Sequence, residues 1–288
     1  MVMSVAITGA AGQLGQELVS LLPDAAALAR ADLDITDAAE VRRRLATLRP
    51  QVVINAAAFT RVDDCEDDPD LAFRVNAVAV RHLAQVCADL GALLVHISTD
   101  YVFDGAKGEP YTEDDTPNPL SVYGASKLAG EHFARALAPH LVIRTSGVYG
   151  AAGAVTRRGN FVETMLRAAD AGRDLRVVAD QTLSPTPARV VARKIVELVR
   201  CGRRGLYHVA SAGQCSWYEF AREIFRLAGL SPRCEPVTAA AYGARARRPR
   251  YSVLARARLE AIGADDLPSW QHALAEYLRA RRRLAADV

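Results

Sequence analysis

The first 150 residues alternate short apolar runs with longer segments whose apolar residues recur at helical spacing. The runs predict strands at 4–8, 26–29, 51–57, 92–98 and 140–146. The segments between them predict helices, among them a long one from Leu71 to Gly91 that includes Val78 in its apolar stripe. Apolar strands separated by helices are typical of a parallel sheet covered on both faces. The sequence therefore predicts an α/β fold with a doubly wound parallel sheet.

Three glycines follow the first predicted strand. Gly9, Gly12 and Gly15 stand in ITGAAGQLG with the spacing GxxGxxG, between that strand and its helix. Glycines at this place let the backbone approach a pyrophosphate, which then lies at the positive end of the helix. A tight strand-to-helix turn would also explain them, but their position at the first strand favours a dinucleotide site. The sheet is therefore expected to be Rossmann-like.

The charge after the second strand bears on which dinucleotide binds. An acidic residue there would hold the ribose 2′-hydroxyl of NAD, whereas a basic one favours the 2′-phosphate of NADP. The first charged residue is Arg30, which favours NADPH. A shift of the strand end by two residues would put Asp32 in that place, and Arg30 would then be a solvated loop charge. We therefore expect NADPH and keep NADH as an alternative.

The alternation loosens after residue 150, resumes as a helix at 186–199 and a strand at 205–211, and then gives way to helical segments. This pattern predicts two domains that interleave along the chain. Residues 1–150 plus 182–211 would form the dinucleotide-binding domain. Residues 151–181 plus 212–288 would form a smaller C-terminal substrate domain.

Composition argues against several classes of partner. The net charge is +3, and the arginine clusters are not accompanied by zinc-ligand spacing or a stripe of aromatic and basic residues, so we expect no nucleic acid. The five cysteines are scattered and lack a CxxC pair, which favours reduced thiols in a cytosol and no metal site. No apolar run approaches the roughly 18 residues of a membrane span, and the N-terminus does not resemble a signal peptide. We therefore expect a cytoplasmic protein without a membrane partner.

Polar residues with catalytic potential gather around two predicted elements. Tyr123 and Lys127 lie four residues apart in VYGASK, on one face of a helix, where a cation would lower the pKa of the phenol. Either residue alone would be an ordinary surface side chain. Ser98, Thr99 and Asp100 end the 92–98 strand, at the edge where such sheets bind ligands. Together with the glycine loop, these groups favour hydride transfer to a ketone, with a phenol as proton donor and a hydroxyl at the carbonyl.

A series of motifs over nearly the whole chain resembles the extended short-chain dehydrogenases, and most closely the dTDP-4-dehydrorhamnose reductase family. They are GAAGQLG, NAAAFTRVDDCE, VNA, STDYVFDG, VYGASKLAGE, RTSGVYG, and GNFVETML followed by DQTLSPT. The resemblance implies that Tyr123 donates the proton, that Lys127 binds the nicotinamide ribose and lowers the tyrosine pKa, and that Thr99 supports the carbonyl.

The same resemblance implies two sets of binding residues. The cofactor set is Gly9, Gly12, Gln13, Leu14, Gly15, Arg30, Asp34, Ile35, Ala56, Ala57 and Ala58, with Tyr123 and Lys127. Among these, Asp34 and Ile35 would lie near the adenine. The substrate set is Thr99, Asp100, Asn160 and Arg248, with Asp100 and Asn160 facing the sugar and Arg248 at the diphosphate.

Two positions separate this chain from relatives. Sugar nucleotide 4,6-dehydratases resemble it but carry an acidic pair after the threonine, whereas Tyr101 follows Asp100 here, so dehydration is not expected. Gly147 stands where the family often has a tryptophan against the sugar. Its loss removes a large apolar surface and points to another sugar, or to a substitute wall from the AAGAVTRRGN segment at 151–160.

The expected reaction is the NAD(P)H-dependent reduction of the C4 ketone of dTDP-4-dehydro-L-rhamnose to dTDP-L-rhamnose. The sugar nucleotide would be the small-molecule partner, and a homodimer is possible. One alternative is a reductase or epimerase of another sugar nucleotide, which Gly147 favours. The other is a non-catalytic regulatory subunit resembling the β-subunit of methionine adenosyltransferase, against which the intact Thr99, Tyr123 and Lys127 set argues.

Overall fold

A six-stranded parallel sheet forms the centre of the computed structural model, which describes residues 3–151 and 159–286. Its strands are β1 (Val5–Thr8), β2 (Ala26–Leu28), β3 (Val52–Asn55), β4 (Leu93–Thr99), β5 (His140–Thr145) and β10 (Gly205–His208). They run in the order β10-β5-β4-β3-β1-β2, and every neighbouring pair is parallel. The predicted doubly wound sheet is confirmed.

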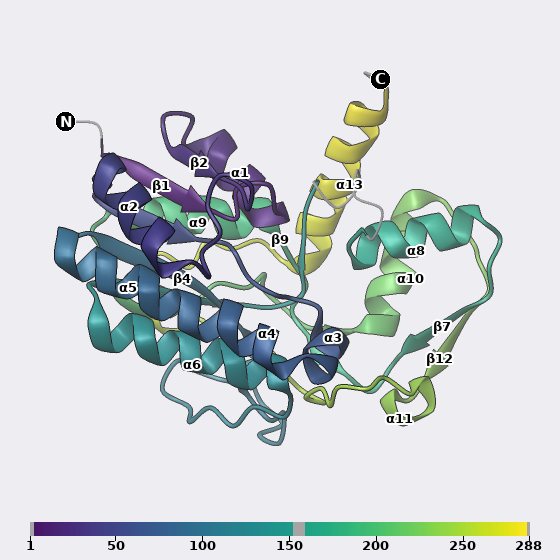
Figure 1. Ribbon diagram of the computed structural model, residues 1–288. Coiled ribbons are helices and arrows are strands. Elements are labelled where there is room, and N and C mark those ends of the chain that lie inside the picture. Colours follow the sequence, from purple (N-terminus) through teal and green to yellow (C-terminus); the bar gives the residue numbers. More distant parts are fainter. Residues whose placement is uncertain (1–2, 152–158, 287–288) are drawn as a thin grey trace.

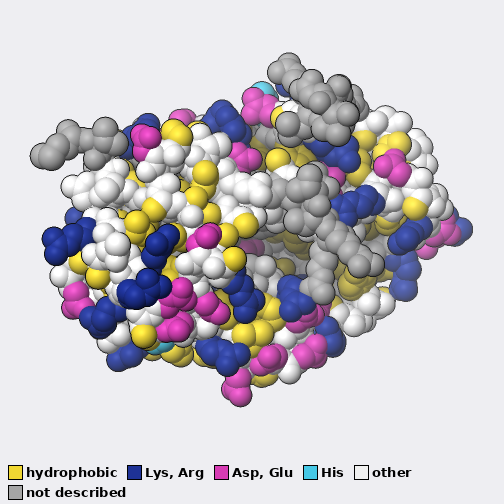
Figure 2. Space-filling model, turned by 45° about the horizontal axis from the view of Figure 1, so that its top comes forward, with side chains coloured by type: hydrophobic (Ala, Val, Ile, Leu, Met, Phe, Trp, Pro, Cys, Tyr) yellow, Lys and Arg dark blue, Asp and Glu magenta, His cyan; other side chains and the backbone are white. Residues whose placement is uncertain are grey.

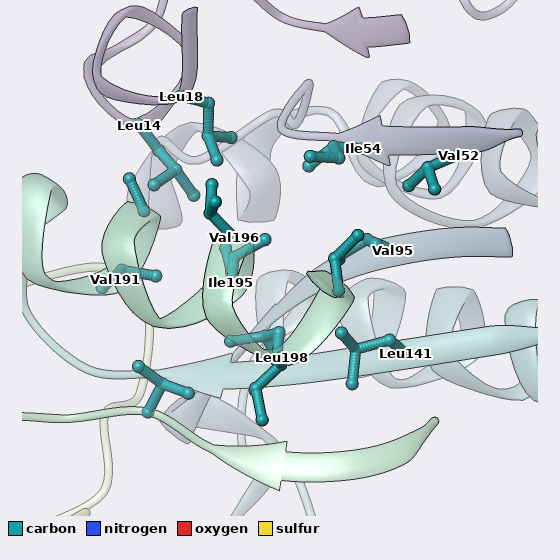
Figure 3. Close-up of a cluster of buried hydrophobic side chains, with 14 of the residues drawn as sticks. Leu14, Leu18, Val52, Ile54, Val95, Leu141, Val191, Ile195, Val196 and Leu198 are labelled. Carbon is teal, nitrogen blue, oxygen red and sulfur yellow. The ribbon is translucent and has the colours of Figure 1, made fainter. Parts of the chain in front are cut away.

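Helices cover both faces of this sheet (Figure 1). On one face lie α1 (Gln13–Leu21) and α9 (Ala188–Arg200); on the other lie α2 (Ala38–Leu48), α5 (Ala79–Leu90) and α6 (Val122–Leu137). Figure 3 shows Leu14, Leu18 and Ile195 packed against Ile54 and Val95 of the strands, all of them buried. The apolar runs of the strands are thus explained, since both of their faces are covered.

The strand order reverses between β1 and β3, which places two loops side by side. β1 pairs with β2 on one side and with β3 on the other. The glycine loop after β1 and the segment that begins with Ala56 after β3 therefore leave the sheet at the same carboxyl edge. Ligands of open α/β sheets bind at such a reversal.

A second group of elements packs beside the sheet and has a core of its own. It contains α8 (Phe161–Asp170), α10 (Trp217–Ala228) and α13 (Trp270–Ala286), together with β7 (Leu175–Val178) and β12 (Cys234–Val237), which pair in parallel. Phe220, Ile224 and Leu274 are completely buried at its centre. This core is built from Tyr149 and from residues within 161–177 and 215–278. The exact division into two domains stays a prediction.

Shorter elements complete the fold. They are β6 (Val148–Tyr149), β8 (Thr182–Leu183), β9 (Thr186–Pro187), β11 (Cys215–Ser216), α3 (Val62–Asp67), α4 (Pro69–Phe73), α11 (Ala239–Tyr242), α12 (Ala257–Ala261), the π-helical turn η1 (Arg74–Val78) and the 3₁₀ turn η2 (Asp100–Val102). β6 pairs with β9, and β8 with β11.

The predicted single helix from Leu71 to Gly91 is wrong in its first part, where α4, η1 and α5 follow one another. The wider turn η1 carries Asn76, which is buried and accepts a hydrogen bond from the Phe59 amide at 2.8 Å and donates to the Phe59 carbonyl at 3.0 Å. A π-helical turn changes the angular phase of the residues after it. Val78, expected in the apolar stripe, is 42% exposed.

Candidate active site

The glycine loop and the start of α1 form one wall of a pocket at the carboxyl edge of the sheet. Gly9 has φ of 69°, and a Cβ there would lie 2.5 Å from the Ala57 amide nitrogen, so a side chain is excluded. Gly12 caps α1 without a side-chain hydrogen bond, which leaves the first helical amides free to bind an anion.

The pocket has a volume of about 670 Å³. Its lining comprises Gly9, Ala11, Gly12, Arg30, Leu33, Asp34, Ile35, Thr36, Ala56, Ala57, Ala58, Phe59, Arg61, Leu71, Arg74 and Val75. Eight of the predicted cofactor residues belong to this set. Bare backbone, a helix N-terminus, an acidic residue and several arginines suit a dinucleotide with a pyrophosphate at its centre. The residues present therefore fit the expected cofactor.

Three predicted cofactor residues lie beside this lining and not in it. Leu14 points into the core of the sheet domain (Figure 3), so only its backbone can meet a ligand. A Cβ on Gly15 would lie 2.2 Å from the Gly9 carbonyl oxygen, so this glycine permits the close approach of helix and loop. The Gln13 side-chain oxygen accepts hydrogen bonds from the Gly150 amide at 2.8 Å and the Asn160 amide group at 2.9 Å.

Asn160 makes hydrogen bonds within the protein through both of its polar atoms. Its oxygen accepts a hydrogen bond from the Glu163 amide and caps α8, while its amide nitrogen donates to Gln13 and to the Gly150 carbonyl oxygen at 3.0 Å. The side chain is buried and its polar atoms are engaged within the protein. The side chain thus links the glycine loop to the second group of elements, and its contact with a sugar stays a prediction.

The start of α6 brings Tyr123 and Lys127 to the end of β4. Ser121 caps the helix, and a Cβ on Gly124 would lie 2.2 Å from the Tyr101 carbonyl oxygen, so glycine lets the first turn pack on the 99–101 segment. The Lys127 ammonium group is buried and donates a hydrogen bond to the Ile97 carbonyl oxygen at 2.6 Å. Burial lowers the pKa of Lys127 to about 8.

The Tyr123 phenol lies beside Thr99. Burial raises the pKa of Tyr123 above its ordinary value, and the hydrogen bond with Thr99 lowers it in part. The expected lowering of this pKa by Lys127 is not seen, because the ammonium group is turned to the Ile97 carbonyl oxygen. A raised pKa keeps the phenol protonated at neutral pH, which is the form that a proton donor needs.

Asp100 lies beneath this group and does not face open space. Thr99 donates a hydrogen bond to its Oδ1 at 3.0 Å, and Ser146 and Ser252 donate to its Oδ2 at 2.8 and 2.6 Å. The residue is 2% exposed. Burial raises the pKa of its carboxyl to about 6, although the three hydrogen bonds lower this pKa in part. In this arrangement the carboxyl positions Thr99. The contact of Asp100 with the sugar stays a prediction.

Ser146, Ser252 and Asn76 were not predicted as site residues. Ser252 lies 152 positions after Asp100 in the chain, so no local pattern connects them. Ser146 stands in the RTSGVYG motif and Asn76 in VNA, but serine and asparagine occur in every loop and turn. Asn76 also donates to Ser126 of α6 at 3.1 Å, which ties the pocket segment at Phe59 to the helix of the catalytic pair.

A second, smaller pocket of about 260 Å³ is lined by residues of α8, β7, α10 and α11 and of the segments that follow β7 and α11. Its lining is Phe161, Thr164, Met165, Arg176, Val177, Val178, Gln181, Trp217, Ala239, Tyr242, Ala244 and Arg248. Figure 2 shows the molecule hollowed between its two parts, with apolar and basic side chains at the hollow.

Arg248 lines this pocket and is held by an acidic partner. Its Nη1 and Nη2 lie 3.1 and 2.8 Å from the two carboxylate oxygens of Asp63, and this hydrogen bond is the largest cause of the lowered pKa of Asp63. The bidentate pair fixes the guanidinium plane. The predicted diphosphate-binding arginine thus lies at a pocket that could take a nucleotide.

Gly147 has φ of 53°, a value that strongly favours glycine. A Cβ there would lie 2.8 Å from the Leu183 Cδ1 atom and 3.7 Å from the Trp217 ring. Trp217 packs against Phe161, with ring centroids 4.6 Å apart. The space beside Gly147 is therefore filled by Leu183 and Pro185, with the Trp217 indole of α10 next to them. Most of the other substitute wall that we considered, at 151–160, lies outside the described residues.

Within residues 3–151 and 159–286, no group of three or more His, Cys, Asp or Glu side chains is arranged to hold a metal ion. In the same described part of the chain, no helix has the length and apolar character needed to cross a membrane.

Comparison with known proteins gives one consistent family. Residues 3–283 match the model of the RmlD substrate binding domain. A dTDP-4-dehydrorhamnose reductase of Streptomyces griseus is 43% identical, over 94% of this chain and 91% of its own length. A dTDP-4-keto-6-deoxy-D-glucose reductase of Streptomyces niveus is 40% identical, over 94% of each chain. The crystal structure of dTDP-4-dehydrorhamnose reductase from Bacillus anthracis str. Ames in complex with NADP is 39% identical, with a TM-score of 0.93, and covers 97% of this chain and all of that chain.

Proposed function

Because the chain belongs to the RmlD substrate binding domain family, we propose that it is an NADPH-dependent ketoreductase that reduces dTDP-4-dehydro-L-rhamnose at C4 to dTDP-L-rhamnose. One observation carries the proposal: Thr99, Tyr123 and Lys127 lie together where β4 ends and α6 begins. This edge of the sheet also bears the pocket of the glycine loop.

The nicotinamide cofactor, when bound, supplies the hydride for C4. Tyr123 would give its phenol proton to the carbonyl oxygen, and the Thr99 hydroxyl would hold that oxygen. Asp100 accepts the Thr99 hydrogen bond and so sets the orientation of this hydroxyl. The Lys127 ammonium group is fixed by its hydrogen bond to the Ile97 carbonyl oxygen and does not lower the pKa of Tyr123. Its proposed role is therefore to bind the nicotinamide ribose.

The sugar nucleotide would occupy the smaller pocket. Arg248 and Arg176 would bind the diphosphate, since guanidinium groups match phosphate oxygens. Phe161 and Trp217 offer aromatic faces for the base or the sugar. These assignments, like those of the individual cofactor residues, are part of the proposal.

The test is oxidation of NADPH, followed by its absorbance, when purified protein is given dTDP-4-dehydro-L-rhamnose. Tyr123→Phe should lower kcat by about 10²- to 10⁴-fold, as expected for a lost general acid. Binding of NADPH, measured by calorimetry, should change less than about twofold. Tyr218→Phe is the matched control, because it removes a phenol that bonds only to Arg222 on α10 among the contacts described.

Full activity in Tyr123→Phe would remove the tyrosine from the mechanism. Failure of the protein to oxidise either NADPH or NADH, together with stable binding to another enzyme, would favour the regulatory-subunit alternative. The same assay over a panel of 4-keto sugar nucleotides would test the second candidate, a reductase or epimerase of another sugar. Gly147 favours that candidate, as does the similarity to the Streptomyces niveus protein.

We also propose a cytoplasmic location and a homodimer. Fractionation of cells and light scattering of the purified protein test these two points directly.

A further inference from the structure

Three arginines line the mouth of the larger pocket together with one acidic residue, Asp34. Arg61 is already paired, with its Nη1 2.6 Å from the Asp64 carboxylate. Arg30 and Arg74 remain. They come from different elements, because Arg30 follows β2 and Arg74 begins η1.

Arg30 extends into solvent at this mouth. Its side chain is 89% exposed, and its Nη2 lies 4.0 Å from Oδ2 of Asp34. Asp34 itself is turned towards its own loop, since its Oδ1 accepts hydrogen bonds from the amide and the hydroxyl of Thr36, at 2.9 and 2.8 Å. These two hydrogen bonds are the main cause of the lowered pKa of Asp34. The charges of Arg30 and Arg74 lower it further, so both arginines lie near this carboxylate.

The backbone of Arg74 belongs to a turn that is fixed by its neighbour Asn76, while its side chain is exposed. Leu71, Arg74 and Val75 are three and four residues apart, share one helical face and all line the pocket. Asn76, in the same turn, is fixed by its hydrogen bonds to Phe59. Among the residues that the structure describes, none forms an ion pair with the Arg74 guanidinium group. A cation on a fixed turn beside a nucleotide pocket is thus available to a ligand.

We propose that Arg30 and Arg74 together bind the 2′-phosphate of NADPH, and that Arg74 is a specificity-determining residue of this site. Two guanidinium groups and one carboxylate leave a net positive charge, which suits a phosphate dianion and gives little to a 2′-hydroxyl. When no phosphate is bound, Asp34 is the acidic residue of the pocket lining that offsets the charges of Arg30 and Arg74. The inference rests on the proposed function only in requiring that this pocket takes a nicotinamide dinucleotide.

The experiment uses adenine nucleotides, which bind without any reaction. Calorimetry compares the binding of 2′,5′-ADP with that of 5′-AMP for the wild type, Arg74→Leu and Arg74→Lys. Loss of a charged hydrogen-bond partner should weaken 2′,5′-ADP about 10- to 100-fold in Arg74→Leu and leave 5′-AMP within about twofold. Arg74→Lys keeps the charge and should recover part of the loss. Arg81→Leu is the matched control, because Arg81 is exposed on α5 outside the pocket.

Equal losses of affinity for both nucleotides in Arg74→Leu would overturn the proposal, because Arg74 would then shape the pocket without contacting the 2′-phosphate. Unchanged binding of 2′,5′-ADP would overturn it as well. A selective loss for 2′,5′-ADP supports the proposal even if no ketone is reduced, in which case only the proposed function fails. A wild-type protein that binds neither nucleotide would contradict the phosphate site, whatever its activity.

Discussion

Asparagine in place of Asp100 should make the pH dependence of stability differ from that of the wild type. The carboxyl is 2% exposed, and burial raises its pKa to about 6 from an ordinary value of 3.8. The difference is about 2 pKa units, and each unit corresponds to about 1.4 kcal/mol. Keeping Asp100 ionised in the folded protein therefore costs roughly 3 kcal/mol.

The sign of the effect follows from which state binds the proton more tightly. The folded protein does, because its Asp100 pKa lies above the unfolded value. The stability associated with this group is therefore full at low pH and is lost as the pH rises from about 4 to about 6. Asparagine does not titrate, so the free energy of unfolding of Asp100→Asn should rise relative to the wild type by up to about 3 kcal/mol over this interval. A constant loss of about 1–2 kcal/mol is expected at every pH, because Ser146 and Ser252 must turn to accept from the new amide.

Urea unfolding at closely spaced pH values from about 4 to about 8 measures this difference. Asp104→Asn is the control, since hydrogen bonds from Ala106, Asn118 and Tyr111 lower the pKa of Asp104 below its ordinary value of 3.8. Asp104 is then ionised in both the folded and the unfolded state above about pH 5, so the difference in stability between this variant and the wild type should stay nearly constant from about pH 5 to about pH 8. Parallel curves for Asp100→Asn and the wild type would refute the assignment of a raised pKa to Asp100. The kcat of Asp100→Asn at about pH 8 should stay within roughly tenfold of the wild-type value, because asparagine keeps an oxygen acceptor for the Thr99 hydroxyl.

Three further outcomes follow from the site. Gly147→Ala should lower the free energy of unfolding by about 2–4 kcal/mol in urea titrations, since φ of 53° and the Leu183 Cδ1 contact both oppose a Cβ. The same substitution should cost less in a Leu183→Ala background, because the contact with Cδ1 is then absent. Asp63→Asn should raise the KM for the sugar nucleotide about tenfold with little change in kcat, because the Arg248 guanidinium loses its bidentate partner. Burial lowers the pKa of Lys127 to about 8, so kcat/KM should fall about tenfold per pH unit above that value, and Lys127→Arg should lack this descending limb whatever its residual rate.

The central sheet could be predicted because its signals are local. Each strand is a short apolar run, and Gly9 and Gly15 are required by contacts under 3 Å between neighbouring backbone segments. Such requirements leave a mark in the sequence, since no other residue fits. Eight of the sixteen pocket residues were predicted, the two glycines and Arg30 from their places after β1 and β2, and the other five from the resemblance of the motifs to a known family.

The polar partners of the site could not be predicted in this way. Asp100 and Asn160 were both expected to face the sugar, and both have their polar atoms engaged by groups distant in the chain. A motif states that a polar residue is needed at a position, but not whether a ligand or another part of the protein satisfies it. The wide turn at Asn76 was missed on similar grounds, because its cause is a hydrogen bond to Phe59, 17 residues earlier.

The internal bonds of Asp100 and Asn160 bear on how substrate is recognised. Either side chain could contact a sugar only by giving up a buried hydrogen bond, and an unpaired buried polar group costs about 1–3 kcal/mol. Part of the binding free energy would be spent on that exchange. Arg248 and Trp217, by contrast, already line an open pocket, and Arg248 is held in a fixed plane by Asp63. Selection among sugar nucleotides should therefore respond more strongly to changes at Trp217 and Arg248 than at Asn160. The measured difference in kcat/KM between two 4-keto sugars in Trp217→Phe and Asn160→Asp decides this, and a larger change of the ratio in Asn160→Asp would show that the internal bonds open on binding.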